Sequence, residues 1–252
     1  MKKITIRGIN FDNVNMEEAV TLAENALNKK RLTSVFTPNA EIAQLAAESP
    51  EMRGLLRRAD ILLPDGAGIV LASEILKTPL KEKVAGVDFG DRVLALAAQK
   101  SYPVFFLGGK PGIAKLAAKK KKEQYPALSV VGVQDGYFKK EGIENDAVVK
   151  KINESGAAIL FVCLGAPAQE KWIDRNKDRL FSVKLAIGLG GTLDVYAGIV
   201  RRAPKIFIRT RLEWFYRLLK EPRRMKRMMK LPKYIFGTYR EKFSLSKKMN
   251  QD

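Results

Sequence analysis

The chain has 252 residues, 46% of them hydrophobic, enough for the core of one large α/β domain or of a domain with an appendage. It carries 46 Lys and Arg against 27 Asp and Glu, for a formal net charge of +19. It has no histidine, which excludes Ser-His and Cys-His nucleophile pairs and imidazole metal ligands and leaves carboxylates as the general bases. The single cysteine, Cys163, excludes an internal disulfide, and its place in an apolar run predicts a buried strand residue.

The N-terminal segment, residues 1–11, alternates apolar and polar residues as a strand does. It lacks the apolar core of a signal peptide. Nothing in it argues for export, so we expect a cytoplasmic protein.

Short apolar runs then alternate with helical segments. The predicted strands are 33–36, 61–63, 104–107, 129–133, 159–164 and 185–189, and the helices between them include 39–48, 88–100, 111–125, 144–155 and 168–176. Continuous apolar strands separated by helices are typical of a mainly parallel sheet covered on both faces. The sequence therefore predicts a Rossmann-like α/β fold.

Residues 201–252 hold seventeen Lys and Arg but four acids, so this tail carries +13 of the net charge. Apolar residues recur in it at the spacing of one helix face: Leu212, Phe215, Tyr216 and Leu219, then Met225, Met228 and Met229 after Pro222. Such a basic amphipathic helix suits the surface of an anionic membrane, but also a helix packed on its own core, or nucleic acid. No run is long and apolar enough to span a bilayer. We expect an α/β catalytic domain over 1–200 and a basic helical appendage over 201–252.

Glycine-rich turns follow several predicted strands. In an open parallel sheet, ligands bind beyond the carboxyl ends of the strands. The glycines at these ends are Gly108, Gly109, Gly165, Gly188, Gly190 and Gly191. Their backbone amides, with the dipole of a following helix, suit a nucleotide or sugar nucleotide, although no turn has the Walker pattern or a dinucleotide fingerprint.

Polar side chains occupy the same strand ends. Asp65 either accepts a proton from an attacking hydroxyl or caps the helix that follows, and Asn39 either contacts a ligand or caps its helix. Thr37 contacts a ligand or simply ends its strand. Gln169 bonds a sugar hydroxyl or merely occupies a first helical turn, and Asp194 bonds ribose hydroxyls or is a surface acid.

These residues belong to motifs that follow one another in a known order. The motifs are TPNAE (37–41), LPDG (63–66), VAGVD (84–88), DGY (135–137), LGAPAQEK (164–171), GLGG with Asp194 (188–194), RRAP (201–204) and LEWFYR (212–217). In this order they resemble the WecG/TagA/CpsF glycosyltransferases, over residues 33 to about 232.

The resemblance implies an inverting, metal-independent transfer with no cofactor. Its members most similar to this chain move N-acetylmannosamine from UDP to undecaprenyl-diphosphate-N-acetylglucosamine, in wall teichoic acid linkage-unit synthesis. Other members use another UDP-sugar, a mannosaminuronic acid or a hexose, for capsule or other surface polysaccharides. A nucleic-acid-binding protein remains a remote alternative, and homo-oligomer formation stays open.

The resemblance also implies roles for individual residues. It makes Asp65 the general base and puts Thr37, Asn39 and Gln169 in the same pocket. Lys83 stands where relatives often carry Arg, which keeps a positive charge near the diphosphate but loses the bidentate fork. From the tail, Arg217, Arg224 and Arg227 are expected to close over the site at the inner face of the cell membrane and to meet the acceptor's phosphates, while Arg223 stands where relatives often have Trp.

Overall fold

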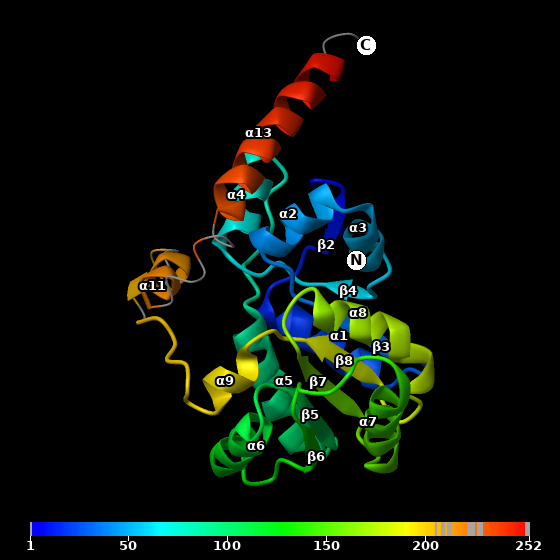
Figure 1. The fold of residues 1–252 in the computed structure, drawn as a ribbon. Helices are drawn as coiled ribbons and strands as arrows, with labels where there is room; N and C mark the ends of the chain where they lie inside the picture. The colour runs from blue at the N-terminus through cyan, green and yellow to red at the C-terminus, as the bar shows by residue number, and fades with distance from the viewer. Residues whose placement is uncertain are drawn as a thin grey trace.

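A computed structural model of the chain describes residues 2–204, 206–207, 210, 213–220, 225 and 229–249. Its central sheet has six parallel strands in the spatial order β4-β3-β8-β7-β5-β6 (Figure 1). They are β3 (Thr33–Phe36), β4 (Ile61–Leu62), β5 (Val104–Gly108), β6 (Val130–Gln134), β7 (Ile159–Cys163) and β8 (Leu185–Gly188). The predicted parallel sheet is confirmed, and each of its six predicted strands matches an observed one within one residue at either end.

Helices cover both faces of this sheet (Figure 1). One face packs against α1 (Met16–Leu27), α5 (Gly86–Lys100), α6 (Ile113–Gln124) and α9 (Thr192–Tyr196). The other packs against α2 (Ala40–Glu48), α3 (Pro50–Arg57), α4 (Ala67–Ile75), α7 (Gly142–Glu154) and α8 (Ala168–Asn176), which a 3-10 turn, η1 (Lys177–Arg179), extends.

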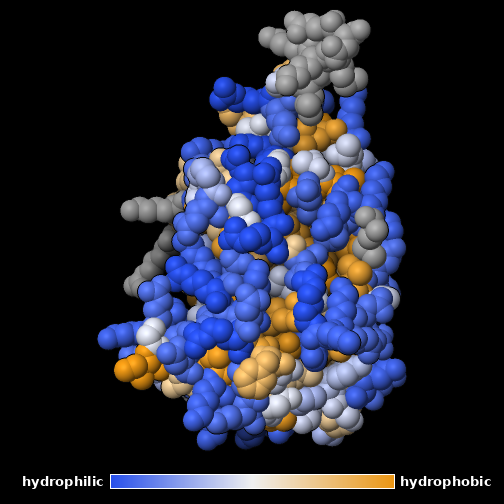
Figure 2. All heavy atoms as spheres, turned by 90° about the vertical axis from the view of Figure 1, so that its right-hand side faces the viewer, coloured by the Kyte–Doolittle hydropathy of each residue, from blue (hydrophilic) through white to orange (hydrophobic). Residues whose placement is uncertain are grey.

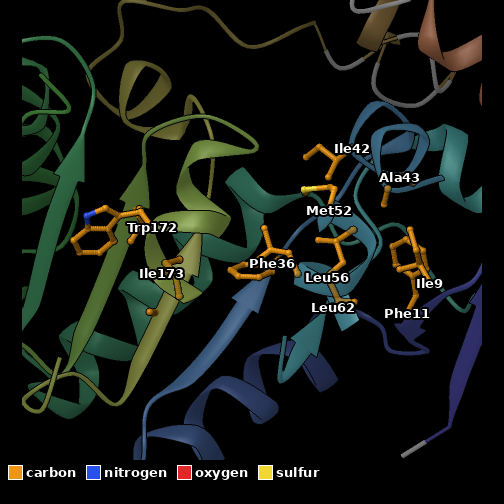
Figure 3. Close-up of a cluster of buried hydrophobic side chains, with 14 of the residues drawn as sticks. Ile9, Phe11, Phe36, Ile42, Ala43, Met52, Leu56, Leu62, Trp172 and Ile173 are labelled. Carbon is orange, nitrogen blue, oxygen red and sulfur yellow. The ribbon is translucent and has the colours of Figure 1, made fainter. Parts of the chain in front are cut away.

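The strands divide their side chains between two hydrophobic clusters. In β5, Phe105 and Leu107 belong to one cluster while Val104 and Phe106 belong to the other. This alternation follows from the two-residue period of a strand, and it makes a doubly covered strand apolar at every position. Figure 3 shows part of the first cluster, in which Phe36 of β3 lies among side chains of the covering helices.

The N-terminal segment, whose alternation is typical of a strand, forms two strands joined in a hairpin, and the turn between them was not predicted from the sequence. Strands β1 (Lys3–Ile6) and β2 (Ile9–Asp12) are antiparallel, with Ile6 paired to Ile9. The two residues between them, Arg7 and Gly8, have φ angles of 52° and 76°. Positive φ at both positions of a two-residue turn is the geometry that matches the twist of paired strands, and it reverses the chain there.

In the part of the tail that the structure describes, helices α11 (Glu213–Lys220) and α13 (Lys230–Met249) have defined bounds. Helix α13 packs against α2 and α4 and then extends past the body of the molecule (Figure 1). Its Tyr234 is fully buried, and the Arg7 guanidinium lies 5.7 Å from the centre of the Tyr234 ring and donates to the Tyr234 carbonyl at 3.2 Å. Arg7 therefore links the turn of the N-terminal hairpin to helix α13.

The outer side of the tail keeps apolar residues in solvent. On α13 these are Phe236, Tyr239 and Phe243, and before α13 in the chain they include Phe215, Met225 and Met229. Of the predicted apolar stripe, Leu212 and Met228 lie outside the described residues, as does the side chain of Leu219. By contrast, the side of the molecule shown in Figure 2 is mostly hydrophilic, with apolar atoms in separated patches.

Candidate active site

A cavity of about 330 Å³ opens beyond the carboxyl ends of β3, β4, β7 and β8. Strands β3 and β8 are neighbours, yet the chain leaves β3 toward α2 on one face and β8 toward α9 on the other. Such a divergence opens a crevice at the sheet edge, where α/β proteins bind ligands. The cavity walls come from segments 37–42, 65–68, 83–87, 165–169 and 189–195, with Val200, Trp214 and Leu231.

Asp65 lies in this cavity at the end of β4. Its Oδ2 accepts the backbone N–H of Gly86, in the first turn of α5, at 3.2 Å. The alternative that Asp65 caps α4 is wrong, because the capping residue there is Gly66, with φ 88°, and the cap makes no side-chain hydrogen bond. A helix N-terminus favours negative charge, so the start of α5 is a suitable neighbour for an acidic side chain.

Thr37 and Asn39 face the same cavity from the end of β3. The Thr37 hydroxyl donates to the Gly188 carbonyl at 3.2 Å, so Thr37 ties β3 to β8 as well as lining the site. A Cβ atom on Gly86 would lie 2.8 Å from the Thr37 Oγ1, which explains the glycine there. The Asn39 side chain accepts the N–H of Ile42 at 3.1 Å, so Asn39 both caps α2 and borders the cavity.

Gln169 reaches the cavity from the first turn of α8 and is held at both ends of its amide. Its Oε1 accepts the Gly190 N–H at 2.8 Å, and its Nε2 donates to Glu170 Oε1 at 2.9 Å. A Cβ on Gly188 would lie 3.1 Å from the Gln169 Nε2, so the glycine at the end of β8 leaves room for this amide.

Lys83 and Asp194 put opposite charges on the cavity wall. Lys83 precedes α5, and the Val84 N–H donates to the Pro64 carbonyl at 2.9 Å, which holds the lysine segment against the Asp65 turn. Asp194 is half-buried in the first turn of α9. Three of the predicted glycines, Gly165, Gly190 and Gly191, also line the cavity.

The predicted glycines Gly108 and Gly109 do not line this cavity, although they lie at the same edge of the sheet, after β5. A Cβ on Gly108 would lie 2.2 Å from the Cys163 carbonyl oxygen, and the Gly109 N–H donates to that same oxygen at 3.2 Å. Close approach to β7 therefore accounts for the glycine at 108. Gly188 lies beneath Gln169 and also stays outside the cavity wall.

The tail completes the wall on one side. Trp214 of α11 and Leu231 of α13 line the cavity. A Cβ on Gly68 would lie 2.5 Å from Leu231 Cδ1, so the glycine in α4 allows α13 to approach. Arg217 is in α11, but its side chain, like all of Arg224 and Arg227, lies outside the described residues.

Cys163 is the buried strand residue that the sequence predicts. Burial raises the pKa of its thiol to about 12, so it stays protonated at neutral pH. Among the residues that the structure describes, no three His, Cys, Asp or Glu side chains gather as a metal site would require. No helix in this described part is long and apolar enough to cross a bilayer.

Two side-chain interactions were not predicted, although their residues lie in the motifs described above: Gln169 with Glu170, and Arg202 with Asp88. Glu170 is 1% exposed beside Gln169, and burial raises the pKa of its carboxyl. Arg202 pairs through both terminal nitrogens with the carboxylate of Asp88 in α5, which joins the start of the tail to the helix that donates to Asp65. These residues lie in the motifs LGAPAQEK, VAGVD and RRAP, which mark them as candidates. The sequence does not show which of them bond to one another.

A doubly wound parallel sheet with a cavity beyond the carboxyl ends of its strands is the arrangement in which open α/β proteins bind their ligands. The family model described as "Glycosyl transferase WecG/TagA/CpsF family" matches residues 4–248. The chain belongs to this family and is therefore a glycosyltransferase.

Three similar relatives share one name, N-acetylglucosaminyldiphosphoundecaprenol N-acetyl-beta-D-mannosaminyltransferase. The one from Bacillus spizizenii is 38% identical over 83% of this chain and 79% of its own length. The one from Bacillus subtilis is 35% identical over 96% and 93%, and the one from Staphylococcus aureus is 31% identical over 97% and 95%. The match thus extends over nearly the full length of two of these relatives.

Proposed function

We propose that this protein transfers N-acetylmannosamine from UDP to undecaprenyl-diphosphate-N-acetylglucosamine, in the synthesis of the wall teichoic acid linkage unit. The observation that carries the proposal is the convergence of Asp65, Thr37, Asn39 and Gln169 on one cavity, in a chain with three similar relatives that carry the name of this reaction.

The proposed chemistry is a single displacement with inversion. An acceptor hydroxyl attacks the anomeric carbon of the donor sugar, the new C–O bond forms as the bond to the UDP oxygen breaks, and Asp65 takes the hydroxyl proton. Thr37, Asn39 and Gln169 orient the sugars, and Asp194 bonds ribose hydroxyls. The departing UDP gains negative charge, which Lys83 and backbone amides of the glycine turns are suited to stabilise.

Metal independence is part of this proposal. With Lys83 and amides receiving the diphosphate, we expect EDTA to leave the rate of transfer unchanged. Mass-spectrometric assay of the product before and after chelation tests this. Loss of transfer on chelation, restored by Mg²⁺ or Mn²⁺, would contradict it.

The tail, residues 201–252, is proposed to complete the site at the inner face of the cell membrane. The exposed Phe236, Tyr239 and Phe243 would enter the interface, and the surrounding Lys and Arg would meet anionic headgroups. In this arrangement Arg217, Arg224 and Arg227 bind the phosphates of the lipid-linked acceptor.

The substrate assignment is tested by incubating the protein with a panel of UDP-sugars and a short-chain analogue of the lipid acceptor. Mass spectrometry should detect one added N-acetylhexosamine, with UDP-N-acetylmannosamine as the preferred donor. Preference for a mannosaminuronic acid or a hexose would move the protein to another surface polysaccharide. Nucleic-acid binding with a steep salt dependence, and no stabilisation by UDP, would overturn the assignment.

A further inference from the structure

Glu170 is a buried acid that the proposed displacement does not use. It is 1% exposed, its Oε1 accepts the Nε2 hydrogen bond of Gln169, and its Oε2 has no hydrogen-bond partner among the described residues. Burying a carboxyl group whose hydrogen-bonding capacity is only partly used is unfavourable for folding. A buried glutamate at this position therefore needs a function that an apolar residue of the same size could not perform.

That role lies in the geometry of the Gln169 amide. Its bond from Gly190 determines which amide atom points at the loop after β8, but a single bond leaves the amide free to swing about that axis. The second bond, to Glu170, removes this freedom. One of the two Nε2 hydrogens is used by Glu170, which leaves the other for a ligand in the cavity that Gln169 lines.

The surroundings keep the amide from finding another position. Gly188 lies directly beneath it, and a Cβ there would be 3.1 Å from Nε2. The Thr37 hydroxyl donates to the carbonyl of the same Gly188, so the ends of β3 and β8 and the start of α8 meet at one point. A displaced Gln169 amide would therefore disturb the part of the cavity nearest Thr37.

We propose that Glu170 is a positioning residue, which fixes the Gln169 amide so that its remaining N–H is directed at the sugar being transferred. The proposal rests on the proposed glycosyl transfer, because it assigns the ligand of that N–H. It predicts that Glu170 acts only through Gln169. Hydrogen-bond partners that orient metal ligands contribute about 10-fold to 100-fold in activity, and we expect a similar loss when Glu170 is removed.

The test is a double-mutant cycle with Glu170→Met and Gln169→Ala, assayed with UDP-sugar and the soluble acceptor analogue. We expect Glu170→Met to lower turnover about 10-fold to 100-fold, with UDP affinity near that of the wild type by calorimetry. The double variant should lose no more than Gln169→Ala alone, because the two residues act as one unit. Ile173→Ala, a buried change on the same helix, should lower the melting temperature without lowering turnover of the folded protein.

A readout independent of turnover is the side-chain amide resonance of Gln169, identified in nitrogen-15 spectra by its loss in Gln169→Ala. It should be distinct in the wild type and move to the position of a free amide in Glu170→Met. If that variant does not fold, Glu170→Gln replaces it: its carbonyl can accept the same bond, so the resonance and most of the turnover should persist.

Additive losses in the cycle, unchanged turnover in Glu170→Met, or an inactive but folded Glu170→Gln would overturn the role of Glu170. Absence of transfer by the wild type, with the amide still held, would instead overturn the proposed function.

Discussion

The contact between Asp65 and the start of α5 makes the carboxylate the first residue to test. Asp65→Asn keeps the size of the side chain but removes its ability to take a proton. We expect transfer to fall about 100-fold to 10,000-fold while UDP still binds. Product analysis and calorimetry give the two quantities. Asp174→Asn, which alters a surface ion pair with Arg58, should leave transfer near normal, and near-normal transfer by Asp65→Asn would show that another group is the base.

Gly86 offers a test of steric fit that is separate from charge. Gly86→Ala adds a Cβ 2.8 Å from Thr37 Oγ1, so the threonine must shift and transfer should fall. An alanine within a helix normally stabilises it by about 0.5–1 kcal/mol relative to glycine. The matched control is Gly54→Ala in α3, where the nearest atom is the end of the flexible Arg58 side chain at 3.3 Å. Transfer activity and melting temperature are measured for both variants. Equal activity of Gly86→Ala and Gly54→Ala would show that the fit between Gly86 and Thr37 does not matter for transfer.

At this scale the sequence predicts which residues gather but not how they bond. Asp65, Thr37, Asn39 and Gln169 are all placed by one rule, that ligands meet the carboxyl ends of parallel strands. Whether Asp65 or Gly66 caps helix α4 depends on the backbone conformation of Gly66, which cannot be read from the sequence. The bond between Gln169 and Glu170 depends on their burial in the folded protein, so adjacency in sequence does not predict it.

Between elements, Asp60 links the first two parallel strands. Its carboxylate accepts the Ser34 N–H and hydroxyl, both at 2.9 Å, and pairs with Arg31 at 2.8 Å. Burial alone would raise the pKa of Asp60, but these bonds outweigh it and hold the pKa below its usual value of 3.8. A carboxyl group with a lowered folded pKa stabilises the fold fully above its unfolded pKa, and this contribution is lost as pH falls through the folded value.

We therefore expect Asp60→Ala to lower the free energy of unfolding by about 1.5–3 kcal/mol at neutral pH. The difference from the wild type should shrink as the pH is lowered below about 4. Urea unfolding of both proteins at a series of pH values measures it. A difference that stays constant with pH would mean that lost packing, and not the charged bonds, accounts for the effect.

The elements themselves are predictable where burial on both faces makes the pattern strong. Strand β3 and helix α8 have the predicted bounds, because an apolar run and a helical period each end abruptly there. The N-terminal hairpin was missed because its only signals are a one-residue shift in the alternation, from Ile4 and Ile6 to Ile9 and Phe11, and an Arg at positive φ, which carries no composition signal. Helix α13 lies beyond the apolar spacing identified in the tail, and its packing against α2 and α4 involves elements far away in sequence.

For the molecule as a whole, α13 has one face in the core and one in solvent, and the two faces make separable predictions. Tyr234→Ala removes a fully buried ring, so the free energy of unfolding should fall by about 3–5 kcal/mol. Phe243→Ser changes an exposed side chain on the same helix and should leave stability nearly unchanged while weakening co-sedimentation with anionic vesicles. Thermal unfolding and co-sedimentation measure the pair. Equal vesicle binding by wild type and Phe243→Ser would remove that residue from the membrane surface.

At the same scale, the sequence predicts the charge and amphipathic character of the tail but not its docking. Net charge is a sum over residues, so counting Lys, Arg, Asp and Glu is enough to predict it. Docking depends on pairs such as Gly68 with Leu231 and Arg7 with Tyr234, whose members lie far apart in sequence.

The contact between Arg7 and Tyr234 joins the hairpin of β1 and β2 to helix α13. A ribosome releases the hairpin, α2 and α4 long before α13, and domains begin to fold as they emerge. Before α13 emerges, the surface that buries Tyr234 is open to solvent and the Leu231 wall of the cavity is missing. Docking of α13 supplies both, so a chain that stops before α13 should remain a target for chaperones and proteases.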